Sequence, residues 1–291
     1  MTRSGGFWAG VVLTGAAFGA VVATGYFVVN HHPVTHDGSC TVTANGETYA
    51  RTAEQTNYAA LIAASGRRMD LPTFGTTVAI AAAIQESGLR NLDYGDRDSL
   101  GLFQQRPSQG WGTAEEILNP NYAAVKFYSR LISVDGWQDM RVTDAAQAVQ
   151  RSGYPEAYQD HADEAAAWSA AFRGEAAFAA VDCDLNAVTD ASTAKRFTAR
   201  LVADYGEGVY TVSVVGRNNH AVLLGITATS GMQQDLDAIA NWSVGVASEQ
   251  AVASVTFGDA QWLREQGVGA VTSPAGYAGV TVAVVESVTT D

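Results

Sequence analysis

Basic residues are scarce in this chain. It has 17 Lys and Arg against 30 Asp and Glu, which gives 291 residues a formal net charge of -13. Nucleic-acid binding depends on clustered Lys and Arg, so this balance argues against a nucleic-acid partner. It argues equally against electrostatic attraction to anionic lipid or to acidic polymers. Recognition of a large polar ligand would therefore rest on hydrogen bonds and ring stacking, while the acidic surface favours solubility.

Cysteine is nearly absent, since Cys40 and Cys183 are the only two. Neither has the neighbouring Cys or His spacing of a metal site, and the histidines at 31, 32 and 36 have no accompanying Cys or carboxylate cluster. We therefore expect no metal and no other cofactor. The two cysteines could be free thiols, but in an exported protein an isolated pair usually forms a disulfide, which is our prediction. Closing so long a loop would be worth roughly 4–5 kcal/mol in the chain-entropy model.

One run of 23 residues, Phe7 to Val29, contains no charge. A helix of that length spans a bilayer of ~30 Å. Arg3 precedes the run, and the positive-inside rule then places the N-terminus in the cytoplasm and the chain after residue 30 outside. We predict a cytoplasmic tip and transmembrane anchor at 1–30, and hence a single-pass cell-membrane protein whose bulk is extracytoplasmic. The alternative is a secreted protein, released by signal-peptide cleavage near 21–23.

A second charge-free stretch, FGTTVAIAAAIQ at 74–85, leads directly to Glu86. A helix that is apolar on all sides belongs in a core, and an isolated carboxylate at its end needs a reason because buried carboxylates are costly. A polar turn follows, and then GLFQQRPSQGWG at 101–112, where amides and aromatic rings are close together. A core helix that delivers one carboxylate to a groove of this composition suits a protein that handles a sugar polymer.

These two blocks resemble the paired signature of lysozyme-like, soluble-lytic-transglycosylase-type peptidoglycan-cleaving domains, as in actinobacterial membrane-anchored cell-wall proteins. The matching residues are Glu86 and Ser87, followed by the turn Gly101 to Gln104, and the resemblance covers roughly residues 40–183. It implies that peptidoglycan glycan strands are the partner. It also implies that Glu86 is the general acid/base that cleaves the β-1,4 bond between N-acetylmuramic acid and N-acetylglucosamine.

The chemistry of such a cleavage needs an acid that protonates the leaving oxygen. Burial at the end of an apolar helix favours the protonated form of Glu86. A hydrolytic muramidase commonly uses a second carboxylate, and Asp93, Asp96 and Asp98 lie in the following loop, but residues of this type also form turns, which we favour here. A lytic transglycosylase needs no such partner, because the same Glu acts as base while the muramic acid 6-hydroxyl closes onto the anomeric carbon. We predict the transglycosylase, with the muramidase as the alternative.

Substrate contacts are expected around this carboxylate. In the family, the positions of Ser87 and Gln104 lie near the catalytic Glu. Amides and rings in the same segment could bind sugar, although core packing explains the rings equally well: Gln105, Gln109, Phe103, Trp111 and Tyr94. Family enzymes usually carry an Ala-Tyr-Asn-Ala-Gly-like block whose Tyr approaches the Glu, whereas this chain has AAQAVQRSGYPEAY at 145–158. Either Tyr154 or Tyr158 could take the place of that Tyr.

The remaining patterns define the predicted domains. Helical periodicity dominates up to Cys183, with a stop at Gly66, an Asn-Pro start at 119–120 and a single further helix predicted at 155–178, after the break at Tyr154-Pro155. Beyond it, strands are expected at 208–216, 220–229, 253–257 and 279–287, and helices at 191–204, 232–242 and 259–267. Arg217, Asn219 and His220 fit a hairpin turn better than a polar site.

We thus predict an α+β protein overall: an N-terminal transmembrane helix, a linker at 31–50, an all-α lysozyme-like transglycosylase domain at 51–184, and a small α+β domain of unknown role at 190–291. The alternative function is a non-catalytic peptidoglycan-binding or envelope-assembly protein. It would use the lysozyme-like groove, or an envelope protein partner of the C-terminal domain.

Overall fold

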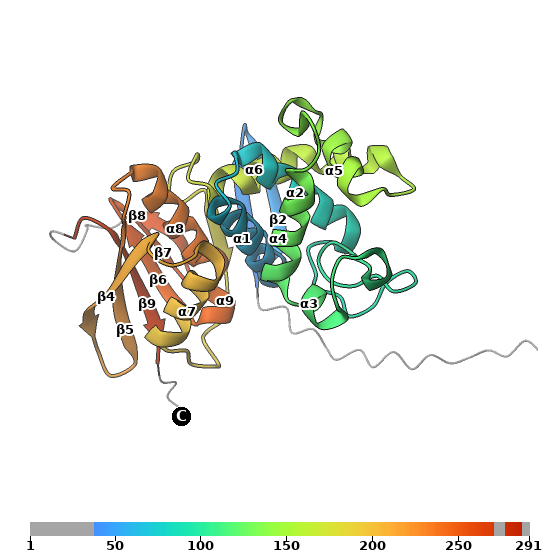
Figure 1. Ribbon diagram of the computed structural model, residues 1–291. Helices are drawn as coiled ribbons and strands as arrows, with labels where there is room; N and C mark the ends of the chain where they lie inside the picture. The colour runs from blue at the N-terminus through green and yellow to red at the C-terminus, as the bar shows by residue number, and fades with distance from the viewer. Residues whose placement is uncertain (1–37, 271–276, 287–291) are drawn as a thin grey trace, which may run out of the picture. The chain divides into compact units, whose positions relative to one another are not determined.

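The computed structural model describes residues 38–270 and 277–286 (Figure 1). In these ranges the chain forms α-helices, short 3-10 helices and antiparallel strands. The strands are β1 (Ser39–Ala44), β2 (Glu47–Thr52), β3 (Val181–Asp184), β4 (Tyr210–Arg217), β5 (Ala221–Ala228), β6 (Val252–Phe257), β7 (Ala260–Leu263), β8 (Gly267–Ala270) and β9 (Val280–Val285). The α-helices are α1 (Ala53–Arg68), α2 (Thr73–Ser87), α3 (Ala114–Leu118), α4 (Pro120–Leu131), α5 (Val142–Gln150), α6 (Ala162–Phe172), α7 (Ala194–Tyr205), α8 (Gln233–Gly245) and α9 (Ala247–Gln250). The 3-10 helices are η1 (Pro107–Gln109), η2 (Trp137–Asp139) and η3 (Pro155–His161).

A three-stranded sheet joins the two ends of the helical region. Its order is β2-β1-β3, and Cys40 on β1 lies opposite Cys183 on β3 in the antiparallel register. The predicted disulfide between them is confirmed, and it closes a sequence separation of 143 residues. Such a bond fits an extracellular protein. The segment predicted as a linker at 31–50 therefore contains β1 and the start of β2, and Cys40 and Val42 alternate toward the core as a half-buried strand requires.

Helix α2 is the centre of the helical region, as its charge-free sequence predicts. The residues at 78–83 are fully buried, and α2 packs against α6, α5, α1 and α4. The helix ends at Gly88, whose φ of +63° lets its N–H and that of Leu89 bond back to the last turn. Glu86 is thereby held in the final turn, where the buried helix reaches its edge.

The flanking helices follow the sequence with two exceptions. Asn119 caps α4 by accepting hydrogen bonds from the N–H groups of Asn121 and Tyr122, as the Asn-Pro pair predicts. Helix α1 continues through Gly66 to Arg68, so the predicted stop is wrong. The single helix expected after Pro155 is instead the 3-10 helix η3 followed by α6.

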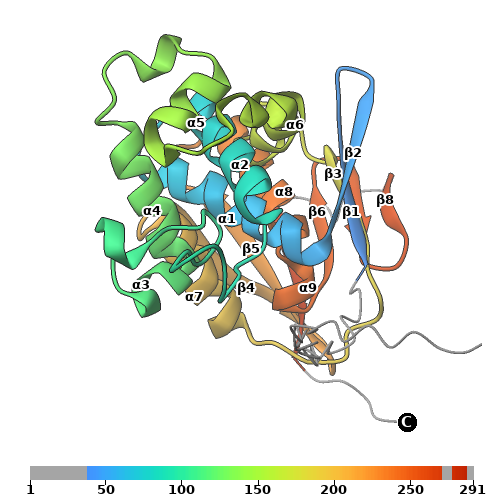
Figure 2. The ribbon, with the colours of Figure 1, turned by 90° about the vertical axis from the view of Figure 1, so that its right-hand side faces the viewer.

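The C-terminal residues form a six-stranded antiparallel sheet in the order β4-β5-β9-β6-β7-β8. Helix α8 packs on β6, β9 and β5, and these strands carry the buried side chains of Val255, Val282 and Leu224. Figures 1 and 2 show α7, α8 and α9 on the side of this sheet that faces α1. The short helix predicted at 259–267 is wrong, because Ala260–Leu263 is strand β7.

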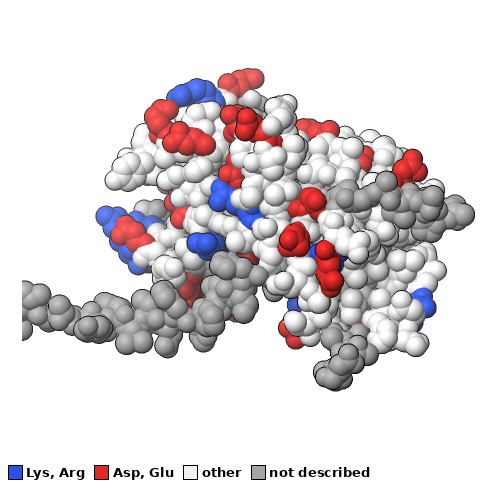
Figure 3. Space-filling model, turned by 180° about the vertical axis from the view of Figure 1, so that it is seen from behind, with Lys and Arg blue, Asp and Glu red and all other residues white. Residues whose placement is uncertain are grey.

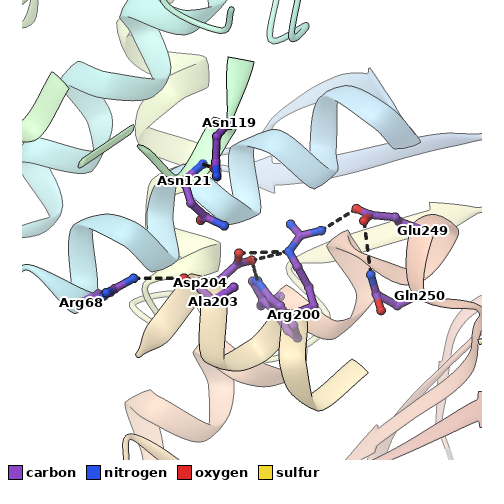
Figure 4. A network of polar contacts seen from close by, with 9 residues as sticks. Arg68, Asn119, Asn121, Arg200, Ala203, Asp204, Glu249 and Gln250 are labelled. Carbon is purple, nitrogen blue, oxygen red and sulfur yellow. Dashed lines mark hydrogen bonds and ion pairs between the residues drawn. The ribbon is translucent and has the colours of Figure 1, made fainter. Parts of the chain in front are cut away.

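The helical and C-terminal regions share one hydrophobic core. Helix α8 crosses α6 so closely that a Cβ on Gly245 would lie 2.9 Å from the ring of Phe172. A polar network adds to this junction (Figure 4). Arg68 on α1 donates to the carbonyl of Ala203 on α7 at 3.2 Å, and the neighbouring buried Asp204 accepts hydrogen bonds from Arg200 and, at 3.0 Å, from the indole of Trp242 on α8. Arg200 also pairs with Glu249 on α9.

The predicted fold class is wrong in its division into an all-α domain and a separate α+β domain. The protein is α+β, but the region expected to be all-α is closed by the sheet β2-β1-β3, and its helices continue into the core of the C-terminal sheet. No helix in residues 38–270 or 277–286 is long and apolar enough to cross a membrane. The predicted span at 7–29 and the histidines at 31, 32 and 36 lie outside the described residues.

Candidate active site

The carboxylate of Glu86 meets the hydroxyl of Tyr158 at the end of α2. Tyr158 Oη donates a hydrogen bond of 2.6 Å to Glu86 Oε1. Burial raises the pKa of Glu86 above its ordinary value, and hydrogen bonds from Tyr158 and Gln150 lower that pKa only in part. The side chain is therefore shifted toward the protonated form that an acid catalyst needs, with one oxygen fixed by a phenol.

Tyr158 reaches Glu86 because η3 packs on α2. Its side chain is fully buried, and Thr143 at the start of α5 ties down η3 by donating to the carbonyl of Pro155. Burial and the nearby charge of Glu86 raise the pKa of Tyr158, so the phenol stays protonated and acts as a donor. Tyr154, in contrast, is 77% exposed. Of the two tyrosines that sequence left open, Tyr158 makes the contact.

Ser87 joins the end of α2 to the turn at 101–104. Its hydroxyl lies 2.7 Å from the carbonyl oxygen of Leu102 and 3.1 Å from that of Ala83, and it accepts from the N–H of Arg90. The next carbonyl of the turn, that of Phe103, accepts a 2.8 Å bond from the side-chain amide of Gln150. Two consecutive carbonyls are thus held beside Glu86, one of them by Gln150, a residue that no pattern in the sequence indicates.

The other residues of the turn hold its shape. Phe103 is fully buried and stacks on Phe127 with ring centroids 4.7 Å apart. Gln105 is 1% exposed and donates to the carbonyl of Ala123. Gln104 has a φ of +46° and donates to backbone carbonyls of the same loop, including that of Tyr94. Phe103 and Gln105 therefore lie in the interior rather than on a surface that a sugar could contact.

The loop carboxylates are separate from Glu86. Asp98 accepts from the N–H of Ser108 at 2.8 Å and from Arg106 at 2.7 Å, and these bonds hold the pKa of Asp98 far below its usual range. It stabilises the start of η1, as a turn-forming residue does. Asp93 and Asp96 are exposed. Among the described residues, no carboxylate contributes to the pKa shift of Glu86.

The residues predicted to contact sugar through ring stacking or hydrogen bonds differ in their solvent exposure. Trp111 is 4% exposed, and the guanidinium of Arg130 covers its ring at 3.4 Å from the centroid. Tyr94 is 68% exposed, and Gln109 is exposed at the end of η1. Of the residues that the sequence predicts to contact sugar, Tyr94, Gln109 and Tyr154 are therefore exposed and accessible for stacking or hydrogen bonding.

A second polar contact ties η3 to α2. The ring Nε2 of His161 lies 3.0 Å from the Oε1 atom of Gln85, the residue before Glu86. Burial lowers the pKa of His161, which favours the neutral ring. The sequence carries no signal for this pair, because a single His in a polar segment matches no spacing rule. This pair connects the end of η3 to α2, and Tyr158 connects η3 to α2 three residues earlier, so η3 is attached to α2 at two points.

Within the described part of the chain, no group of three or more His, Cys, Asp and Glu residues lies close enough together to hold a metal ion. Comparison with known protein families finds no match to the chain, and comparison with curated proteins finds none either. The likeness of the two sequence blocks to peptidoglycan-cleaving domains therefore stays a resemblance.

Proposed function

We propose that this protein is a peptidoglycan lytic transglycosylase that cleaves the β-1,4 bond between N-acetylmuramic acid and N-acetylglucosamine. The observation that carries the proposal is the 2.6 Å bond from Tyr158 to Glu86 at the end of a buried helix. It supplies what the sequence left open, a phenol on the carboxylate in place of the family's usual Tyr. The disulfide supports a location outside the cytoplasm, where peptidoglycan lies.

In the first step Glu86 acts as a general acid. Its raised pKa keeps a proton available, and the hydrogen bond from Tyr158 to Oε1 leaves the other carboxyl oxygen to carry that proton toward the glycosidic oxygen. Protonation releases the N-acetylglucosamine side as an alcohol, and positive charge develops at the anomeric carbon of the muramic acid. The carboxylate formed on Glu86 is stabilised by the donors of Tyr158 and Gln150.

In the second step the same carboxylate acts as a base. It accepts the proton of the muramic acid 6-hydroxyl as that oxygen bonds to the anomeric carbon, which yields a 1,6-anhydro ring and returns Glu86 to its protonated state. An intramolecular attack has a large proximity advantage over attack by water. One carboxylate is enough for this cycle. This agrees with the contacts of Asp98, which bind Ser108 and Arg106 at η1 rather than Glu86.

The test is the change Glu86→Gln, which keeps the shape and removes the titrating proton. We expect turnover of purified peptidoglycan to fall by a factor of order 10²–10⁴. The matched control is Asp93→Asn, which alters an exposed carboxylate in the following loop and should keep the parent rate. A Glu86→Gln protein that is folded and clears peptidoglycan as fast as the parent would end the enzymatic interpretation.

A further inference from the structure

Arg130 and Arg151 line one hollow of about 400 Å³ at the ends of α4 and α5. Its other described walls are Ser133, Val134, Ala148 and Val149, so no carboxylate lines it. This is unexpected in a chain whose acidic residues outnumber its basic ones by 30 to 17. Figure 3 shows acidic side chains scattered over one face of the molecule and basic ones in a few small groups.

Seven other arginines in the described ranges form ion pairs with nearby carboxylates, as Arg106 does with Asp98. The guanidinium of Arg130 instead lies over the ring of Trp111 and donates through Nη2 to the carbonyls of Gln109 and Gly110, at 3.2 and 3.3 Å. Those bonds leave Nε and Nη1 of Arg130 for another acceptor. Burial and the charge of Arg151 both lower the pKa of Arg130, so the two guanidinium groups repel each other across the hollow.

The helix dipoles explain part of this arrangement. Arg130 is in the last turn of α4, and Arg151 is the C-cap of α5, where positive charge is favoured. This effect accounts for a basic residue at each helix end separately. It does not account for two such residues that face the same hollow without a carboxylate. An anion in the hollow would neutralise both, and planar guanidinium groups suit the two oxygens of a carboxylate.

The hollow adjoins the Glu86 site through the backbone. Gln150, the neighbour of Arg151, donates to the carbonyl of Phe103 and to the carboxylate of Glu86. On the other side, Arg130 holds the loop that follows the turn at 101–104. A glycan bound at Glu86 would therefore lie beside this hollow, within reach of groups that branch from the sugar chain.

We propose that this hollow binds a carboxylate of the peptidoglycan stem peptide. The arginines would take the charge, and the apolar side chains of Val134 and Val149 would contact the aliphatic part of the peptide. Its volume exceeds what a small inorganic anion needs. The identity of the ligand as a stem peptide rests on the proposed function, whereas the anion-binding character rests on the two arginines alone.

The test is calorimetric titration of the full chain with the soluble peptide L-alanyl-γ-D-glutamyl-L-lysyl-D-alanine. We expect binding that weakens on the order of tenfold or more in Arg151→Gln, since hydrogen bonds to charged groups are worth that factor. Binding should also weaken when the carboxyl groups of the peptide are amidated. Arg196→Gln, which removes an exposed arginine on α7, is the matched control and should bind as the parent does.

Three results would overturn the assignment. The first is equal affinity in the parent and in Arg151→Gln, provided that both are folded. The second is equal affinity for the free and the amidated peptide. The third is preferential binding of inorganic phosphate, or of a peptide-free glycan whose lactyl carboxylates are exposed. Because the peptide contains no glycosidic bond, its binding is measured whether or not the protein cleaves peptidoglycan, so failure here and failure of the enzymatic proposal are distinguishable.

Discussion

Tyr158 and Glu86 are 72 residues apart in sequence, and their side-chain oxygens are 2.6 Å apart in the structure. The contact brings a 3-10 helix onto the last turn of a buried α-helix. It gives the carboxyl group a fixed direction and a donor that moderates the effect of burial on its pKa. Each element of the proposed chemistry depends on this pair, and so do the first predictions.

Tyr158→Phe removes the donor and keeps the ring. Because the lost hydrogen bond lowers the pKa of Glu86, that pKa should rise, and the fall in activity as Glu86 deprotonates should move to higher pH. Turnover at the optimum should drop about tenfold as the carboxyl group loses its orientation. The measurement is the pH profile of kcat/KM on peptidoglycan. Tyr154→Phe, at a 77% exposed side chain, is the control, and an unshifted profile in Tyr158→Phe would remove Tyr158 from the mechanism.

Glu86→Gln should also change stability in a pH-dependent way. The folded-state pKa of Glu86 is raised, so its neutral form favours the fold below the unfolded pKa, and this contribution is lost as pH rises through the folded pKa. Gln cannot ionise, so the variant should gain stability over the parent near pH 8 and lose that advantage near pH 4. Urea unfolding at the two pH values measures this. An equal difference at both would show that burial does not strain the ionised carboxylate.

The helix end that carries Glu86 was predictable, whereas its partner was not. A charge-free run followed by Glu-Ser-Gly specifies where α2 ends, and Asn119-Pro120 specifies where α4 begins. The choice between Tyr154 and Tyr158 depends on the 3-10 geometry of η3, which short-range periodicity does not encode. The burial of Phe103 depends likewise on a partner, Phe127, that lies on another helix.

The errors in fold have similar causes. The strand β1 is only six residues long, and the alternation of apolar Cys40 and Val42 with polar residues indicates a strand, contrary to the predicted linker. Strand β7 has four residues, too few for any period to appear. The shared core of the two regions arises from contacts such as Gly245 against Phe172, which are remote in sequence. The sequence therefore predicts elements better than it predicts which of them share a core.

Loss of the disulfide should be costly. Cys40→Ser with Cys183→Ser removes a cross-link between residues 143 apart, which should lower the free energy of unfolding by about 4 kcal/mol. The strand pairing of β1 with β3 should persist, because its backbone register does not depend on the sulfur atoms. Denaturant titration of the parent and the double variant gives the difference. A midpoint that is unchanged on removal of both sulfur atoms would contradict the cross-link's role.

The polar contacts of Asp204 should stabilise the packing of α7 against α8 and α9. Asp204→Ala leaves Arg200, whose side chain is 11% exposed, without its fully buried carboxylate partner, and should cost about 3 kcal/mol. Glu249→Gln changes the more exposed partner of the same arginine, 42% exposed, and should cost much less. Thermal unfolding monitored by tryptophan fluorescence measures both. Equal effects of the two variants would show that Asp204 is no more important to this packing than a surface ion pair.

The central claim, that Glu86 alone runs a non-hydrolytic cleavage, is tested most directly by digesting peptidoglycan in ¹⁸O-labelled water and weighing the products. The account predicts muramic ends that carry no label and are one water lighter than hydrolysis products, and it predicts that Glu86→Gln releases none of them. Labelled reducing ends, together with loss of activity on substitution of Asp93, Asp96 or Asp98, would contradict it and identify a hydrolytic muramidase instead.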